Sequence, residues 1–369
     1  MFSRLFKVHP ASPAVKESEE EIVDNLAFLH CAGRMQITPP LRPTPRFPVI
    51  VVLCASLDSP KPQGMSAIEL VADVRYTDAA GLPDAIETAE VLLLWDFFST
   101  ALRDAWPRAR SLKWVHVAAA GVDTVLFDEL RESNVVLTNA HGFFDGSIAE
   151  FVLANILAHD KELHANRALQ QAHEWRHRET RRTAGSTAIV VGTGGIGRQI
   201  ARLLQAVGVE VQGAGRSAST NDPDFGTIVS SAALAEHVGW ADNVVVVAPL
   251  TNQTRGMIDA GVFDAMKSSA HLISVGRGPL IDETALLQAL RNGSIAAASL
   301  DVFVTEPLPA ESALWEAPGV TISAHMSGDV VGWRDGLAEQ FTTNVHHWLE
   351  GSDLVNIVDK CLGYVARPH

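Results

Sequence analysis

The sequence predicts an α/β protein built from two doubly wound parallel sheets. Short runs rich in valine, isoleucine and leucine recur from Pro48 onward without polar alternation, as in strands buried on both faces. Helix-like stretches separate most of these runs, and Asp, Gly, Pro or Ser residues bound them. The alternation occurs twice, before and after a long helix-like segment that begins near Ser147.

Each series of apolar runs predicts the strands of one sheet. The helix-like segment 147–165 is the expected hinge between the two series, and 332–349 predicts a last helix. Strands of the first series are expected at 49–53, 69–76, 91–95, 114–118 and 135–138. Strands of the second series are expected at 188–191, 210–213, 243–248, 271–275, 297–300 and 320–322.

Composition limits the classes of protein that the chain can represent. Its 369 residues allow two or three domains, and 47% hydrophobic residues allow large cores. A formal net charge of −14 disfavours nucleic acid and anionic membranes as partners. The three cysteines lie far apart, which predicts neither a disulfide framework nor a metal site and is typical of a cytoplasmic protein. The proline-rich segment 1–47 is interpreted as a poorly ordered appendage without a visible function.

A glycine-rich turn lies at the start of the second series. The segment Gly192-Thr193-Gly194-Gly195-Ile196-Gly197 connects an apolar strand to a helix-like stretch and contains G-x-G-x-x-G. In such a turn the glycines permit a tight bend and close approach of a pyrophosphate, and the helix N-terminus offers free N–H groups to the anion. The motif alone is weak, and a purely structural turn is the alternative. Between a strand and a helix it predicts a dinucleotide site.

The end of the next predicted strand indicates which dinucleotide is favoured. An Asp or Glu that would bind a ribose 2′-hydroxyl is missing there, and Arg216 and Ser217 follow the strand instead. A cation and a hydroxyl suit a 2′-phosphate, so NADP(H) is favoured and NAD(H) remains possible. The alternative is that Arg216 is a solvated loop residue.

Three side chains of the second series suit proton and hydride chemistry on a carboxylate substrate. Arg277, Glu306 and His325 each follow a predicted strand, at the edge where parallel sheets place ligands. Histidine is the natural proton donor at neutral pH, a carboxylate orients it, and a guanidinium binds a substrate carboxylate. Taken singly, His325 could be a core histidine, Arg277 a loop cap and Glu306 a turn residue.

At these residues the sequence resembles the D-isomer-specific 2-hydroxyacid dehydrogenase family, over about residues 48–369. The resemblance implies that Arg277 binds the substrate carboxylate and carbonyl, that His325 is the acid/base, and that Glu306 is the partner of His325. It also implies that Asp301 holds the nicotinamide carboxamide, although Asp301 could simply cap a turn. The arginine-containing cofactor loop looks closer to glyoxylate/hydroxypyruvate reductases.

Further contacts follow from the same resemblance. Ala120 and Gly121 lie in Ala119-Ala120-Gly121-Val122-Asp123, which is similar to the family's substrate loop. Substrate specificity is expected from loops of the first domain near Trp95, whereas His141 and the stretch 175–177 are interpreted as structural. The remaining cofactor contacts implied are Pro249, Thr254, Val275 and Ser327.

The implied fold is discontinuous, with a substrate domain of 48–150 plus 329–369 and a dinucleotide-binding domain of 151–328 inserted between them. The implied activity is hydride transfer between NADP(H) or NAD(H) and a small 2-ketoacid or 2-hydroxyacid, similar to glyoxylate or hydroxypyruvate. The implied assembly is a homodimer. The alternative function is that of a nucleotide-sensing corepressor with the same fold. The acidic balance disfavours DNA contact and therefore favours the enzyme.

Overall fold

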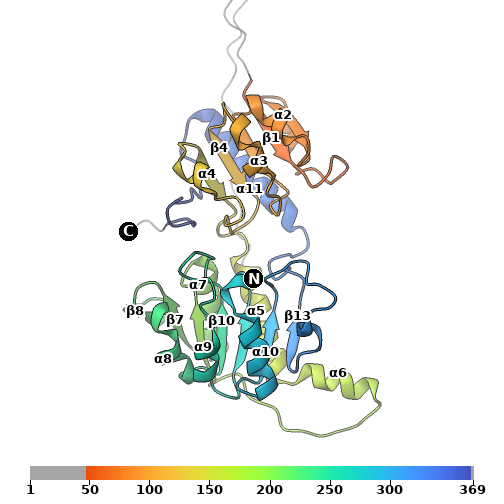
Figure 1. The fold of residues 1–369 in the computed structure, drawn as a ribbon, viewed down its shortest axis with the longest axis vertical. Helices are drawn as coiled ribbons and strands as arrows, with labels where there is room; N and C mark the ends of the chain where they lie inside the picture. The colour runs from red at the N-terminus through yellow and green to blue at the C-terminus, as the bar shows by residue number, and fades with distance from the viewer. Residues whose placement is uncertain (1–46, 367–369) are drawn as a thin grey trace, which may run out of the picture. The chain divides into compact units, whose positions relative to one another are not determined.

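The computed structural model describes residues 47–366 of the chain. Nearly all of the predicted appendage, residues 1–46, lies outside this range. Within the described residues the strands form a five-stranded and an eight-stranded sheet, called here the first and the second sheet (Figure 1). The predicted α/β class with two doubly wound sheets is therefore confirmed.

The first sheet is parallel throughout, with the strand order β2-β1-β3-β4-β5. Every residue of its interior strand β1 is buried, as the unbroken apolar run predicts, whereas the edge strand β2 alternates exposed and more buried residues. Its strands are β1 (Val49–Leu53), β2 (Asp73–Thr77), β3 (Val91–Leu94), β4 (Trp114–Val117) and β5 (Val136–Asn139).

The expected strand at 69–76 is wrong in its first half. Helix α1 (Met65–Ile68) is followed by a continued helical turn, in which the N–H groups of Val71 and Ala72 each donate to the carbonyl oxygen of Ile68 at 2.9 Å. The strand begins only at Asp73. The apolar residues of this stretch therefore follow a helical and not a strand period, and Leu70 is left exposed.

The second sheet has the order β13-β12-β11-β10-β6-β7-β9-β8 and is parallel except for β8, which pairs antiparallel with β9. Neither β8 nor β9 was predicted, because β8 is a polar edge strand without an apolar run. The order of connection reverses between β6 and β10, where open parallel sheets bind ligands. Its strands are β6 (Thr187–Val191), β7 (Glu210–Gly215), β8 (Ser219–Asp222), β9 (Gly226–Ser230), β10 (Asn243–Val246), β11 (His271–Ser274), β12 (Ala297–Leu300) and β13 (Val320–Ile322).

The helix expected over 147–165 is two helices, α5 (Asp145–Asp160) and α6 (Leu163–Gln171). Glu162 between them has φ 48°, a left-handed conformation that interrupts a right-handed helix. No helix of the described residues is long and apolar enough to cross a membrane. The other helices are α2 (Leu82–Ala85), α3 (Ala101–Ala105), α4 (Asp128–Glu132), α7 (Gly195–Ala206), α8 (Leu234–His237), α9 (Ala260–Ala265), α10 (Glu283–Asn292) and α11 (Trp333–Glu350).

Helix α11 packs against the first sheet although it follows the second sheet in sequence. The rings of Phe341 and Trp114 stack with centroids 5.5 Å apart, and the N–H of Val358 donates to the carbonyl oxygen of Leu137 at 2.8 Å. Figure 1 shows α11 beside β4. These contacts support the discontinuous arrangement, and the boundaries 48–150, 151–328 and 329–369 remain our proposal.

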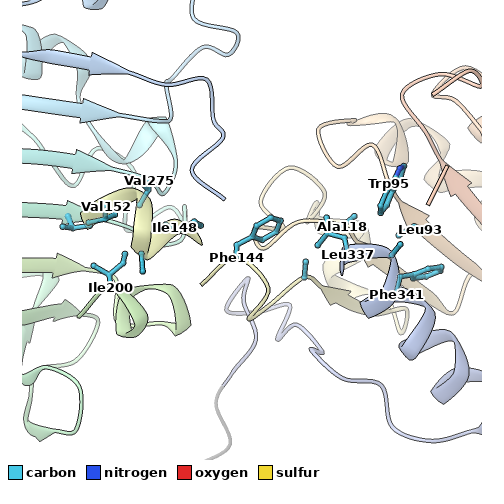
Figure 2. Packing of buried hydrophobic residues seen from close by; sticks show 14 of the residues in the cluster. Leu93, Trp95, Ala118, Phe144, Ile148, Val152, Ile200, Val275, Leu337 and Phe341 are labelled. Atoms are coloured by element: carbon cyan, nitrogen blue, oxygen red, sulfur yellow. The ribbon is translucent and has the colours of Figure 1, made fainter. Parts of the chain in front are cut away.

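One cluster of buried apolar residues contains members from both sheets and from α5. Figure 2 follows it from Leu93, Trp95, Ala118, Leu337 and Phe341, through Phe144, to Ile148, Val152, Ile200 and Val275. Phe144 directly precedes α5, so the packing fixes the start of this helix. That start lies beside the glycine turn described next.

Candidate active site

The predicted cofactor turn follows β6 and leads into α7. Gly192 has φ 118°, and a Cβ added to it would lie 2.7 Å from the amide nitrogen of Ala248, so only glycine fits. A Cβ on Gly197 would collide with the carbonyl oxygen of Gly192. Gly194 caps α7 without a side-chain hydrogen bond, so the N–H groups of the first turn, including that of Ile196, have no intrahelical acceptor. This geometry suits a dinucleotide pyrophosphate.

Arg216 and Ser217 are exposed directly after the last residue of β7. Thr193 lies beside this strand end, since a Cβ on Gly215 would lie 2.9 Å from the Thr193 hydroxyl oxygen. The structure thus brings the glycine turn and the predicted 2′-phosphate residues together at the end of β7.

Two carboxylates that follow β7 in the sequence, those of Asp222 and Asp224, are paired with arginines of α7. Arg198 donates to Asp222 and to Asp224, each at 2.7 Å, and Arg202 donates to Asp224 at 2.6 Å. The hydrogen bond from Arg198 outweighs burial and lowers the pKa of Asp222 to about 2. These two aspartates are therefore ionised, and their charges are compensated by α7.

Glu306 and His325 form a hydrogen-bonded pair. Nδ1 of His325 lies 2.7 Å from Oε2 of Glu306, while Oε1 accepts the N–H of Phe303 at 2.8 Å. Burial alone would raise the pKa of Glu306, but the bonds from His325 and Phe303 and the charge of Arg277 outweigh it and hold that pKa below its ordinary value. An ionised Glu306 stabilises a protonated histidine.

Arg277 meets the predicted substrate loop. Its Nε donates to Oδ1 of Asp123 at 3.0 Å, and its Nη1 donates to the carbonyl oxygen of Gly276 at 2.9 Å. Its Nη2 lies against Gly121, where the guanidinium occupies the space that a Cβ would need. Sequence reasoning missed the ion pair with Asp123, although this residue lies in the loop that carried the resemblance.

Asp301 is completely buried and holds the loop that carries His325. Its Oδ1 accepts the hydroxyl of Ser323 at 2.5 Å and the N–H of Met326 at 2.9 Å, and its Oδ2 accepts the N–H of Ser327 at 2.9 Å. Its main-chain carbonyl accepts the N–H of His325 at 2.8 Å. Asp301 is thus a positioning residue for His325, and the cofactor contacts expected of Asp301 and Ser327 remain predictions.

The other expected contact residues lie along the same carboxyl edge of the second sheet or in the substrate loop. The hydroxyl of Thr254 donates to the carbonyl oxygen of Pro249 at 2.7 Å and closes the turn after β10. Val275 is buried at the end of β11, and its N–H donates to the carbonyl oxygen of Val246 at 3.0 Å. Ala120 precedes Gly121 and its carbonyl oxygen accepts the Asn139 side chain.

Trp95 does not contribute an exposed surface to the site, because its ring is buried and its Nε1 donates to the carbonyl oxygen of Pro60 at 3.2 Å. Phe98, further along the same loop, is 59% exposed and meets the ring of His325 edge-on, with centroids 5.6 Å apart. The predicted loop of the first sheet is therefore in place, with Phe98 and not Trp95 beside the histidine.

Comparison with known proteins identifies the family of the chain. The family model for the D-isomer specific 2-hydroxyacid dehydrogenase, NAD binding domain, matches residues 153–327. Glyoxylate/hydroxypyruvate reductase A of Serratia proteamaculans is 30% identical over 262 residues, which cover 69% of this chain and 82% of that protein.

Solved structures give the same result. A D-isomer specific 2-hydroxyacid dehydrogenase family protein of Aeromonas salmonicida is 30% identical, with a TM-score of 0.73, and the match covers 85% of this chain and 99% of the other. An NADPH-dependent glyoxylate/hydroxypyruvate reductase of Sinorhizobium meliloti, solved with NADP and sulfate, is 29% identical, with a TM-score of 0.72 and coverage of 86% and 100%. The expected homodimer remains a prediction. The chain belongs to the D-isomer specific 2-hydroxyacid dehydrogenases, oxidoreductases that transfer a hydride between a nicotinamide cofactor and a small hydroxyacid or ketoacid.

Proposed function

We propose that this enzyme is an NADPH-dependent reductase of small 2-ketoacids of the glyoxylate and hydroxypyruvate type. The observation that carries the proposal is the convergence of Arg277 and the Glu306–His325 pair at the carboxyl edge of the second sheet. Relatives named as glyoxylate/hydroxypyruvate reductases support the substrate class.

The cofactor preference rests on the surface around Arg216. This arginine and Ser217 follow β7 where a ribose-binding carboxylate is missing, and Asp222 and Asp224 are held by arginines of α7. A 2′-phosphate would therefore meet an exposed cation with little opposing charge. The Sinorhizobium relative, which is named as NADPH-dependent, supports the same preference.

Arg277 is the proposed substrate anchor. Two of its nitrogens are already committed to Asp123 and Gly276, so the guanidinium has a fixed orientation. Its Nη2 has no hydrogen-bond partner among the described residues and lies over Gly121 in the substrate loop. In our proposal this remaining donor group binds the ketoacid carboxylate and polarises the carbonyl.

His325 is the proposed proton donor in the reductive direction. A nicotinamide cofactor, when bound, would supply the hydride that the carbonyl carbon requires. His325, protonated and oriented by Glu306, gives its proton to the carbonyl oxygen as that oxygen becomes a hydroxyl. The Nδ1 bond to Glu306 leaves Nε2 as the nitrogen that carries the transferable proton.

The experiment compares NADPH and NADH in the reduction of glyoxylate and hydroxypyruvate by the parent and by Arg216→Ala. A charge-assisted phosphate contact contributes about 1.5–3 kcal/mol, so the variant should lose roughly 10- to 150-fold in kcat/KM with NADPH. It should lose little with NADH. Arg291→Ala is the matched control, because it removes an exposed arginine near the end of α10, away from β7.

Equal kcat/KM with the two cofactors in the parent would overturn the NADPH preference. A parent that reduces neither ketoacid, while it reduces a larger one, would overturn the substrate class and leave the cofactor result standing.

A further inference from the structure

Two side chains outside the predicted site lie against the glycine turn. A Cβ added to Gly195 would lie 2.6 Å from Oδ2 of Asp145 and 3.4 Å from Cε1 of His141. Gly195 is the first residue of α7, and Asp145 is the first residue of α5. The space that a side chain would take at position 195 is therefore filled by a carboxylate and an imidazole.

The main chain of His141 is held in place by three side chains. Its N–H donates to Oδ1 of Asn139 at 3.3 Å, and its carbonyl oxygen accepts Nε2 of Gln340 and Nδ2 of Asn356, each at 3.1 Å. These partners come from β5, from α11 and from the C-terminal segment. The position of His141 beside the turn is thus fixed by its surroundings.

Asp145 is a carboxylate without a hydrogen-bond partner among the described residues, beside two helix N-termini that lack side-chain caps. Burial raises the pKa of Asp145, and the charges of His141 and Arg202 oppose that shift only in part. Arg202 is itself bound to Asp224 at 2.6 Å. Among the described residues, Asp145 therefore has no hydrogen-bonded or ion-paired cation of its own.

A dinucleotide adds more negative charge at this turn. The N–H groups of the first turn of α7 would receive its diphosphate, and an ionised carboxylate beside Gly195 would repel it. A proton on Asp145 removes this repulsion.

We propose that His141 and Asp145 belong to the diphosphate site and that cofactor binding takes up a proton at Asp145. The inference rests on the nicotinamide cofactor of the family and not on a preference for NADPH, because both nicotinamide dinucleotides carry the diphosphate. It assigns a binding role to His141, which the sequence led us to interpret as structural.

The first test measures the Kd of NADH and of NADPH by protein fluorescence between about pH 5 and pH 8. In the parent, the Kd should rise with pH as Asp145 loses its proton. In Asp145→Asn, the Kd at the upper end should be lower than in the parent by roughly 3- to 10-fold, and much of the pH dependence should disappear.

Glu210→Gln is the matched control. It removes an exposed carboxylate at the first residue of β7. The glycine turn lies at the other end of the strands, so this variant should keep the pH dependence of the parent. Comparing each variant with the parent on the same cofactor cancels the titration of the 2′-phosphate of NADPH.

The second test needs no variant. Calorimetric titration of the parent with NADH, in two buffers of different ionisation enthalpy, counts the protons taken up on binding, and the proposal requires uptake. No proton uptake, or an identical pH dependence in the parent and in Asp145→Asn, would overturn it. An unexpected ratio of NADPH to NADH affinity would overturn only the proposed cofactor preference.

Discussion

Asp301 provides a sharp test of how the fold positions the acid/base residue. Asp301→Asn keeps the size of the side chain but replaces one acceptor oxygen by an NH₂ donor. With the amide in either orientation, the N–H of Met326 or of Ser327 loses its acceptor, because each carboxylate oxygen holds one of them. Ser327 is only 8% exposed, so water cannot readily replace the missing partner.

The size of the effect follows from this one lost bond. An unsatisfied buried donor costs about 1–3 kcal/mol, which corresponds to a fall of roughly 2–12 °C in the melting temperature of a protein of this class. A shift of the loop would also misplace His325 and lower kcat by roughly 10²-fold. Thermal unfolding followed by circular dichroism, together with steady-state kinetics, measures both effects.

Asp329→Asn is the control for stability, since Asp329 is exposed on the same loop and its side chain accepts no main-chain N–H from any residue of the range 47–366. The positioning argument would be refuted by an Asp301→Asn protein that has the melting temperature of the parent but binds NADPH much more weakly. That result would instead favour the direct nicotinamide contact implied by the family resemblance.

Two further substitutions test the surroundings of the histidine. Glu306→Gln removes the carboxylate that holds Nδ1 of His325, so kcat for ketoacid reduction should fall by roughly 10-fold or more. In the parent, the lowered pKa of Glu306 keeps this carboxylate ionised on the acid side, and a profile of kcat against pH checks that limit. Phe98→Ala opens the space beside His325 and should raise kcat/KM for bulkier 2-ketoacids relative to glyoxylate by roughly 10-fold. Phe47→Ala, at an exposed phenylalanine that precedes β1, should leave that ratio unchanged.

The fold was predictable where burial imposes a continuous apolar run. The strands β1, β12 and β13 have the expected bounds. For β1 the reason is burial, because every residue of this strand is buried between the two faces of a parallel sheet and every one is apolar. The edge strand β8 could not be predicted, since its exposed polar residues carry no such pattern. The end of α5 was also missed, because the left-handed residue Glu162 has no local sequence signal such as glycine.

The site was predictable where chemistry depends on residues that follow a strand, such as Arg277 and His325. Contacts between distant segments were not, because periodicity does not determine which loops meet. The ion pair between Arg277 and Asp123 and the contact of Phe98 with His325 are of this kind.

The central claim is that His325 donates the proton during ketoacid reduction, and His325→Ala tests it most directly. Reduction of glyoxylate with saturating NADPH should lose roughly 10²–10⁴-fold in kcat, the contribution of a positioned general acid. The Kd for NADPH should stay near that of the parent, because the proposed diphosphate site lies at the glycine turn after β6 and not at His325. A kcat within about 3-fold of the parent would contradict the assignment of His325 as the proton donor.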